Sequence, residues 1–332
     1  MTKRLKSLLQ YMLMILLAAI LLWLSMRSLN VGDGQSKSEF LWHTWQRSNK
    51  FYLWVMAAIA IASHVLRAYR WKMLLAPTGR EVGLGNSFLS LMVGYLVNLA
   101  IPRGGEVSRC YNLFKLEKTP VEVSFGTVVA ERVVDVICLM LLIAISFAVE
   151  WTRLWAFIDT IELSSEGWQI PGWLILAGLG LAGLLLGVYL LRKNHRLQKI
   201  LQGFRQGLVA VFRIRDKTLF VFISIVIWAL YFAMSYFVIK AFPETSQLGF
   251  SAVLTLFAVG SIAMAAPLPG GAGSYHTLVP LGLVMLYQLP QADAVAFVFV
   301  FHAWQTAIMI VGGLVSLIVT YLLVKWALPE RK

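Results

Sequence analysis

The sequence contains little charge, few cysteines and no nucleotide-binding loop. Charged residues make up 14% of its 332 positions, whereas an ordinary soluble domain carries about 25%. The cysteines, Cys110 and Cys138, lack metal-binding spacing, and we expect buried thiols. No segment between the apolar runs reaches the size of a soluble domain, roughly 100 residues. The sequence thus excludes a separate catalytic domain and gives no reason to expect a metal, a cofactor or an ATP site.

Long hydrophobic runs dominate the chain instead. Hydrophobic residues account for 59% of the sequence, and several runs approach the ~20 apolar residues that a spanning helix needs. We therefore expect an all-α polytopic membrane protein, with a single integral membrane domain over residues 1–332. The first run, from Leu8, follows a basic end and exceeds the apolar core of a signal peptide, ~7 to 15 residues, so we expect it to be retained as a helix.

The positive charge lies in short loops, and its distribution predicts the topology. The net charge is +13, but Lys and Arg in such loops set orientation and contact anionic lipid headgroups. We therefore expect membrane lipids and no nucleic acid as partners, with a homodimer left open. The loop 150–171 is acidic, whereas the loop 192–217 is strongly basic. Because basic loops stay on the cytoplasmic side, we expect a cytoplasmic (inner) membrane protein with both termini in the cytoplasm.

Two apolar segments are interrupted by proline and glycine near their centres. The first, about 84–118, breaks at Pro102, and the second, about 251–288, breaks between Pro267 and Gly273. If the first crossed the membrane fully, the basic loop would lie outside, so we expect a re-entrant helical hairpin in each place, inserted from opposite sides. The expected architecture is six spanning helices plus these two hairpins. Such a pair of interrupted segments is typical of an inverted-repeat transporter with its site near the midplane.

Two groups of basic residues are expected at the cytoplasmic headgroup level. In segment 192–217 apolar residues recur at helical spacing with Arg and Lys on the other face, which predicts an amphipathic helix on the inner leaflet. A basic linker without lipid contact is the alternative. A second basic and aromatic cluster ends the span that begins at Phe51. The residues expected to contact anionic headgroups are Arg67, Arg70, Arg196 and Arg205.

A cluster of charged residues follows the first break. Ionised groups at membrane depth cost several kcal/mol unless they are paired or wet. Arginine suits phosphate, and the helix beginning after Pro102 offers free N–H groups, so we expect a phosphate-bearing headgroup to bind here. Arg103, Glu106 and Arg109 recur every third residue and are expected to pair with one another. Arg132 is expected to reach Asp135. The alternative is a closed ion-pair network that only locks the helices together. The predicted binding residues are Arg103, Glu106, Arg109, Glu131, Arg132 and Asp135.

The second break carries glycines and neutral polar side chains. Its glycines permit close backbone approach or positive φ, and no Gly-Lys-Ser/Thr sequence makes it a Walker loop. Two histidines flank the break, one after it and one in the last span, so a proton relay is one reading and hydrogen-bonded core histidines are the other. As metal ligands they lack further partners. The additional predicted binding residues are Gly270, Gly271, Gly273, His276, His302 and Gln305.

Three motifs, in this order, resemble the lysylphosphatidylglycerol synthase transmembrane-region family of flippase-like membrane proteins. They are Pro102-Arg103-Gly104-Gly105-Glu106-Val107-Ser108-Arg109, Glu131-Arg132-Val133-Val134-Asp135 and Pro269-Gly270-Gly271-Ala272-Gly273. The resemblance covers nearly the whole chain and implies a lipid-translocating domain. Some relatives carry a cytosolic aminoacyl-transferase domain, which we do not expect in a sequence ending at Lys332. The family often has Glu and Arg where this sequence has His276 and His302, which weakens inference of the lipid from relatives.

Together these features predict a flippase or scramblase rather than an enzyme. The expected cargo is a phosphate-bearing or aminoacylated lipid, or a polyprenyl-phosphate carrier, moved between leaflets. One alternative is a non-transporting membrane partner of a cell-envelope glycosyltransferase or lipid synthase. Another is a membrane enzyme acting on a lipid headgroup, with the carboxylates as acid and base.

Overall fold

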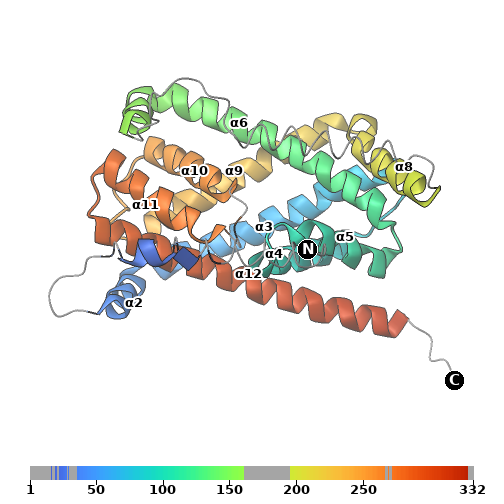
Figure 1. Cartoon of the computed structure of the whole chain (residues 1–332), viewed down its shortest axis with the longest axis horizontal. Helices are drawn as coiled ribbons and strands as arrows, with labels where there is room; N and C mark the ends of the chain where they lie inside the picture. Colours follow the sequence, from blue (N-terminus) through green and yellow to red (C-terminus); the bar gives the residue numbers. More distant parts are fainter. Residues whose placement is uncertain are drawn as a thin grey trace, which may run out of the picture.

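The regular structure of this protein is helical throughout the part of the chain that the structure describes (Figure 1). A computed structural model describes residues 36–160, 195–265, 268 and 271–327, with residues 16, 19–20, 22–27 and 29 near the N-terminus. The helices are α2 (Lys37–Arg47), α3 (Lys50–Leu75), η1 (Ala76–Thr78), α4 (Leu84–Ala100), α5 (Gly104–Glu117), α6 (Val121–Thr160), α8 (His195–Val209), η3 (Ala210–Arg213), α9 (Lys217–Ala241), α10 (Phe250–Ala265), α11 (Ser274–Tyr287) and α12 (Gln291–Ala327).

Four helical stretches are long and apolar enough to cross a membrane. They are Lys50–Thr78, Val121–Thr152, Lys217–Ala241 and Gln291–Trp326, and they coincide with four of the six predicted spans. The other two predicted spans, from Leu8 and from Gly172, lie mostly or wholly outside the described residues. The chain is therefore a multi-pass integral membrane protein.

The first interrupted segment folds as an antiparallel pair of short helices, α4 and α5. Pro102 follows the end of α4, and Arg103 takes a left-handed conformation with φ of 59° before α5 begins. The Gly105 N–H donates to the Asn98 side chain at 2.7 Å, which satisfies one of the free donors at the start of α5. The predicted break thus lies at the predicted residues.

The second interrupted segment forms another antiparallel pair, α10 and α11. The turn between them ends at Gly273, whose φ of 92° is a backbone conformation that residues other than glycine rarely adopt. The Ser274 hydroxyl then reaches back to the Ala263 carbonyl at 2.7 Å and ties the start of α11 to the end of α10. Pro267, Pro269 and Gly270 lie outside the described residues.

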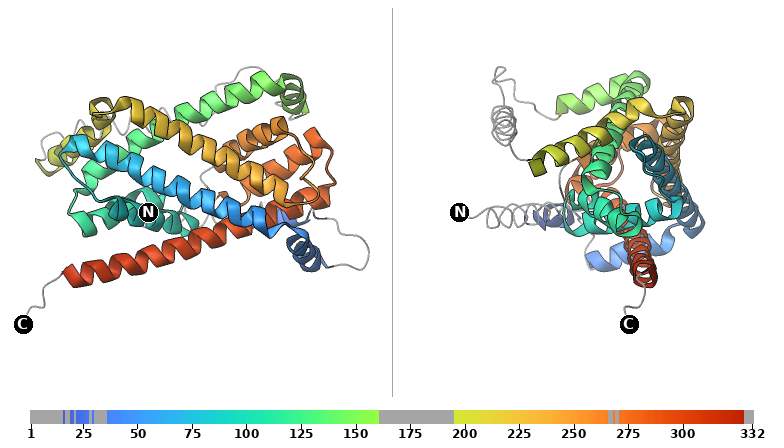
Figure 2. Two further views of the ribbon diagram at one scale, coloured as in Figure 1. Left: turned by 180° about the vertical axis from the view of Figure 1, so that it is seen from behind. Right: turned by 90° about the vertical axis from the view of Figure 1, so that its right-hand side faces the viewer.

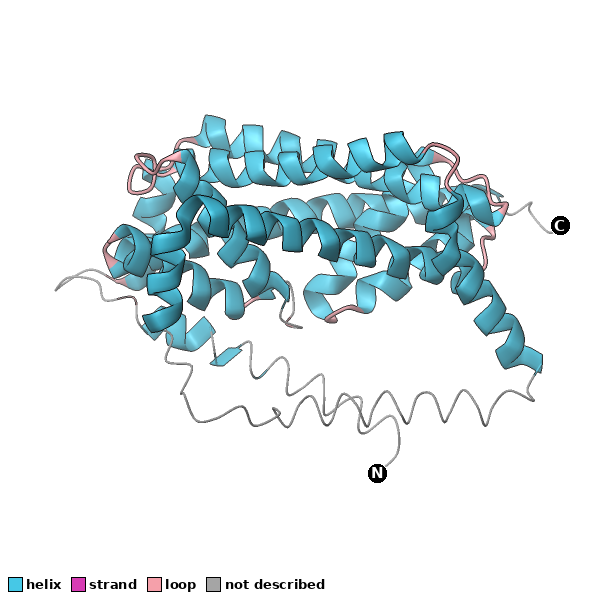
Figure 3. Cartoon of the chain, turned by 90° about the horizontal axis from the view of Figure 1, so that it is seen from above, coloured by secondary structure: helices cyan, strands magenta, loops and turns pink. Residues whose placement is uncertain are grey.

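The long helices enclose these two pairs. α6 and α12 run along opposite long sides of the molecule, with the α4–α5 pair toward one end and the α10–α11 pair toward the other (Figure 1). α3 and α9 lie side by side across the face seen in the left view of Figure 2. Seen from above in Figure 3, loops gather at the two ends of the molecule, and further short loops lie nearer the middle. Tyr95 near the first turn and Tyr275 near the second line one cavity.

The amphipathic helix α8 packs on α6 rather than on lipid alone. A methyl group on Gly207 would lie 2.1 Å from the Val123 carbonyl oxygen, and one on Gly126 would lie 2.2 Å from the Phe204 carbonyl oxygen. Small residues where two membrane helices cross allow such close contact between the backbones. The predicted amphipathic helix is present, and part of its surface packs on α6; its placement on the inner leaflet stays a prediction.

The α6–α8 contact gives a test of the packing. Gly207→Ala should lower stability by about 1–3 kcal/mol, because the new methyl group meets backbone that cannot move alone. Gly85→Ala is the matched control, since a methyl group there has nothing within 4 Å. The measurement is the midpoint of thermal unfolding in detergent, and equal midpoints for the two variants would contradict the close packing.

Candidate functional site

A buried carboxylate, that of Glu131 on α6, lies at the centre of the charged cluster. Its side chain has no exposed area and is within ion-pair distance of four arginines from three helices. The nitrogen–oxygen distances are 2.7 Å to Arg67, 3.3 Å to Arg70, 2.6 Å to Arg109 and 3.5 Å to Arg132. With Asp135, these residues form what we call the Glu131 network.

Helical spacing explains how the Glu131 network assembles. Arg67 and Arg70 are three residues apart on α3, and Glu131 and Asp135 are four apart on α6, so each pair faces one way. Arg70 binds Asp135 at 2.6 Å, and Arg67 reaches it at 3.5 Å. Arg109 enters from α5. The network therefore joins a span, a second span and one helix of the first short pair.

Aromatic side chains hold two of the arginines. The Arg109 guanidinium lies 4.5 Å from the centre of the Trp71 ring, and the Trp71 N–H donates to Thr127 at 2.9 Å. The Arg67 guanidinium donates to the Tyr231 hydroxyl at 3.1 Å. Both contacts orient the guanidinium groups, and the face of the Trp71 ring adds cation–π attraction for Arg109 beyond its ion pair.

Two expectations about this region need correction. Arg67 and Arg70 were expected at the headgroup level, but they are 7% and 0% exposed and bind the carboxylates of α6. The stripe predicted within α5 does not close on itself: Arg109 pairs across to Glu131, and no ion pair joins Arg103 to Glu106 in the described part of the chain. The reason is that Arg103 precedes the helix in a left-handed conformation, so helical spacing does not apply to it.

The remaining predicted contacts have mixed outcomes. Arg132 reaches Asp135 at 3.6 Å, as predicted. One carboxylate oxygen of Glu106 is buried and finds no hydrogen-bond partner among the described residues. Arg205 lies on α8 with its side chain exposed, and the side chain of Arg196 is outside the described residues.

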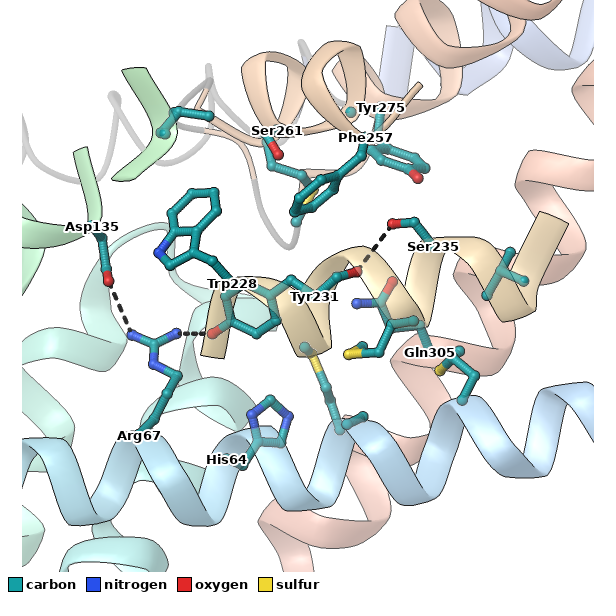
Figure 4. A pocket seen from close by; sticks show the side chains of 18 of the residues that line it. His64, Arg67, Asp135, Trp228, Tyr231, Ser235, Phe257, Ser261, Tyr275 and Gln305 are labelled. Carbon is teal, nitrogen blue, oxygen red and sulfur yellow. Dashed lines mark hydrogen bonds and ion pairs between the residues drawn. The ribbon is translucent and has the colours of Figure 1, made fainter. Parts of the chain in front are cut away.

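The Glu131 network borders a cavity of about 470 Å³ (Figure 4). At one end the wall contains Arg67, Arg132 and Asp135, and further along lie Tyr275 and Gln305. Between them the lining is mostly apolar. It includes Met56, Ala60, Leu139, Trp228, Met234, Val238, Leu256, Phe257, Met264, Phe301, Ile308 and Met309.

Sequence reasoning missed the contribution of α9 to this cavity. Trp228, Tyr231 and Ser235 all line it, and they follow one another at intervals of three and four residues. That spacing of polar and aromatic groups on one face of an apolar helix was the available signal. Arg67 and Arg70 carried a similar signal: two arginines three residues apart within an apolar helix indicate acidic partners inside the protein.

The histidine that follows the second break, on α11, and the histidine of the last span, on α12, lie in contact. The His276 and His302 rings lie 4.6 Å apart, centre to centre, in an edge-to-face arrangement. Tyr275 stacks on His302 at 5.7 Å and, unlike the histidines, lines the cavity. Gly271 and Gly273 lie in the turn with positive φ. The predicted residue Gly270 is outside the described part of the chain.

The unequal burial of the arginines gives a second test. Arg109→Gln should destabilise the protein by about 3–5 kcal/mol, because the change leaves Glu131 buried with one strong partner fewer. Arg132→Gln is the matched control: its side chain is 42% exposed and its distances exceed those of the other arginines to the same carboxylates, so about 0–1 kcal/mol is expected. Thermal unfolding in detergent compares the two, and equal losses would contradict the inferred order.

Comparisons with known proteins agree with the resemblance seen in the motifs. Residues 11–313 match the model of the family described as the lysylphosphatidylglycerol synthase TM region. A UPF0104 membrane protein of Methanocaldococcus jannaschii is 35% identical over 91 residues, which cover 26% of this chain and 27% of that protein. Another UPF0104 membrane protein, from Methanothermobacter thermautotrophicus, is 27% identical over 246 residues, covering 67% of this chain and 72% of that protein. No solved structure matches the chain.

The family model spans the Glu131 network, both short helical pairs and most of the last span, so the match includes every element that builds the cavity. The chain belongs to the lysylphosphatidylglycerol synthase transmembrane-region family.

Proposed function

We propose that this protein moves a lipid with a phosphate-bearing headgroup from one leaflet to the other. The observation that carries the proposal is the cavity, which joins a cluster of arginines to a long apolar wall among membrane helices. A lipid has the same division into a charged head and apolar chains. Arginine's planar guanidinium matches phosphate oxygens two at a time.

In this proposal Arg132 makes the first contact with the headgroup. Its side chain is the most exposed of the four arginine side chains in the Glu131 network, and its ion pairs, at 3.5 and 3.6 Å, are the most easily exchanged. Arg67 stands deeper in the same wall, where Tyr231 and the carboxylates hold it in place. The headgroup thus meets one adaptable and one fixed guanidinium, without any covalent step.

The membrane topology is part of the proposal. Six spans, two of them outside the described residues, place both termini in the cytoplasm, and the short pairs enter the inner membrane from opposite sides as re-entrant hairpins. Their turns then lie within the bilayer, against the cavity, where non-helical backbone is tolerated because protein surrounds it. Alternating movement of one pair relative to the other would open the cavity to each leaflet in turn.

Blocking the cavity tests transport separately from folding. Ser235→Trp places a large ring in the cavity without touching the Glu131 network, so lipid exchange should fall to the rate of protein-free vesicles. Ile225→Trp is the matched control on the same helix, because Ile225 is 61% exposed on the outer surface and its replacement should leave transport unchanged.

The assay measures loss of fluorescence from labelled phospholipids in the inner leaflet of reconstituted vesicles. Unfolding midpoints establish that both variants are folded. If vesicles containing the wild-type protein exchange lipid no faster than protein-free vesicles, the proposal is contradicted. That result would favour a non-transporting role beside a cell-envelope enzyme.

Labelling of single cysteines tests the topology. In a chain with Cys110 and Cys138 replaced by serine, Lys115→Cys at the end of α5 should react only from the cytoplasmic side. Phe250→Cys at the start of α10 should react only from the other side, since the two short pairs enter oppositely. Both positions are exposed, and a membrane-impermeant maleimide on sealed vesicles of each orientation gives the readout. Reaction of both from one side would contradict the two hairpins.

A further inference from the structure

The Glu131 network carries more positive than negative charge. Four guanidinium groups face two carboxylates, which leaves a surplus of two positive charges. Arg103 and Glu106 on the adjoining turn add one charge of each sign and leave that surplus unchanged. Among the described residues that line the cavity, Asp135 is the sole carboxylate. Of the four guanidinium groups, those of Arg67 and Arg132 line the cavity, so an anion that enters it shares these two cations with the carboxylates of Glu131 and Asp135, and the surplus charge favours its binding.

The same wall contains polar atoms without partners. Within the described part of the chain, the Nε atom of Arg132, the Nδ1 atom of His64 and the hydroxyl of Tyr95 are buried and have no hydrogen-bond partner, and all three residues line the cavity. His64 is 6% exposed as a residue and extends toward the cavity from α3 (Figure 4). Buried polar atoms without partners are unfavourable unless something binds them. The surplus charge and these atoms point to the same ligand, an anion with several acceptor oxygens.

We propose that the site selects lipids whose headgroup ends in a phosphate monoester, which rests on the lipid-moving function proposed above. A phosphate monoester carries about −1.5 to −2 charges near neutral pH and three terminal oxygens, so it cancels the surplus of two. A phosphodiester headgroup such as phosphatidylglycerol carries one negative charge and leaves one cation unbalanced. An aminoacylated headgroup adds an ammonium group, which the arginines repel.

The lipid's charge can be varied while its chains stay the same. Vesicles of phosphatidylcholine would contain traces of labelled phosphatidic acid, phosphatidylglycerol or lysylphosphatidylglycerol with identical acyl chains, and rates in protein-free vesicles would be subtracted. We expect phosphatidic acid to cross about tenfold faster than phosphatidylglycerol, corresponding to ~1.4 kcal/mol in selectivity, and lysylphosphatidylglycerol to be slowest. Equal rates for the three lipids would overturn the selectivity while leaving lipid movement established.

Binding gives a readout that does not depend on transport. Short-chain forms of the three lipids would be added to the protein in detergent, where a ligand bound to the folded state raises the unfolding midpoint. Phosphatidic acid should raise it most. If no lipid crosses but this order holds, the transport proposal fails and the charge selectivity stands. If the three lipids raise it equally, the selectivity fails.

Removing one charge provides the matched variant. Arg132→Gln halves the surplus and should reduce the preference for phosphatidic acid in both assays, whereas Arg132→Lys keeps the charge and should retain most of it. Arg80→Gln removes one charge from an exposed position away from the cavity lining and should leave the preference unchanged. The same loss of preference in the Arg80 and Arg132 variants would overturn the proposal.

Discussion

The structure depends on the ion pairs around the carboxylate of Glu131. A buried carboxylate without partners is very costly, and attraction to several guanidinium groups can offset its desolvation only when the geometry is good. Here Arg67 and Arg109 approach it to 2.7 and 2.6 Å from two different helices. Moving α3, α5 or α6 alone would expose or unpair charge inside the protein. Relative to apolar packing, the network thus fixes how these helices are placed more than it adds to stability.

A fixed network beside an exposed arginine separates two tasks that a lipid-moving site must perform. Glu131 and Arg109 are enclosed and hold α5 in the bundle, whereas Arg132 and Asp135 face the cavity with longer contacts between them. An incoming anion can take a place beside Arg132 while the enclosed pairs stay intact. Binding therefore need not disrupt the contacts on which the fold depends, and this is why we assign the cavity-facing members to the headgroup.

The sequence predicted the helix breaks better than it predicted the partners of charged residues. Proline and glycine near 102 and 273 determine local backbone conformation, which is why both breaks lie where predicted. Pairing between Arg67 and Glu131 joins positions 64 residues apart, and hydropathy carries no information about which faces meet. The positive-inside tendency predicts Arg67 and Arg70 at the headgroup level. In the structure they are buried instead, because the carboxylates of α6 lie within ion-pair distance of them. Similarly, the glycines of α6 and α8 matter because the two helices touch there, and the sequence of either helix alone does not specify that contact.

The two short pairs differ in the charge they bring to the cavity, and that difference bears on release. The first pair adjoins a network of permanent cations, whereas in the described part of the second pair the lining contains Tyr275 but no charged side chain. In the proposed function, a phosphate headgroup is therefore attracted most strongly toward the first pair and meets weaker, uncharged partners, Tyr275 and Gln305, further along. A lipid that leaves past the second pair must first give up its ion pairs with the Glu131 network. We therefore expect a lipid to leave on the side of the second pair more slowly than it arrives from that side. A binding site does not itself change the equilibrium between leaflets, so in the proposed function movement without added energy would equalise a lipid between the two leaflets rather than accumulate it in one.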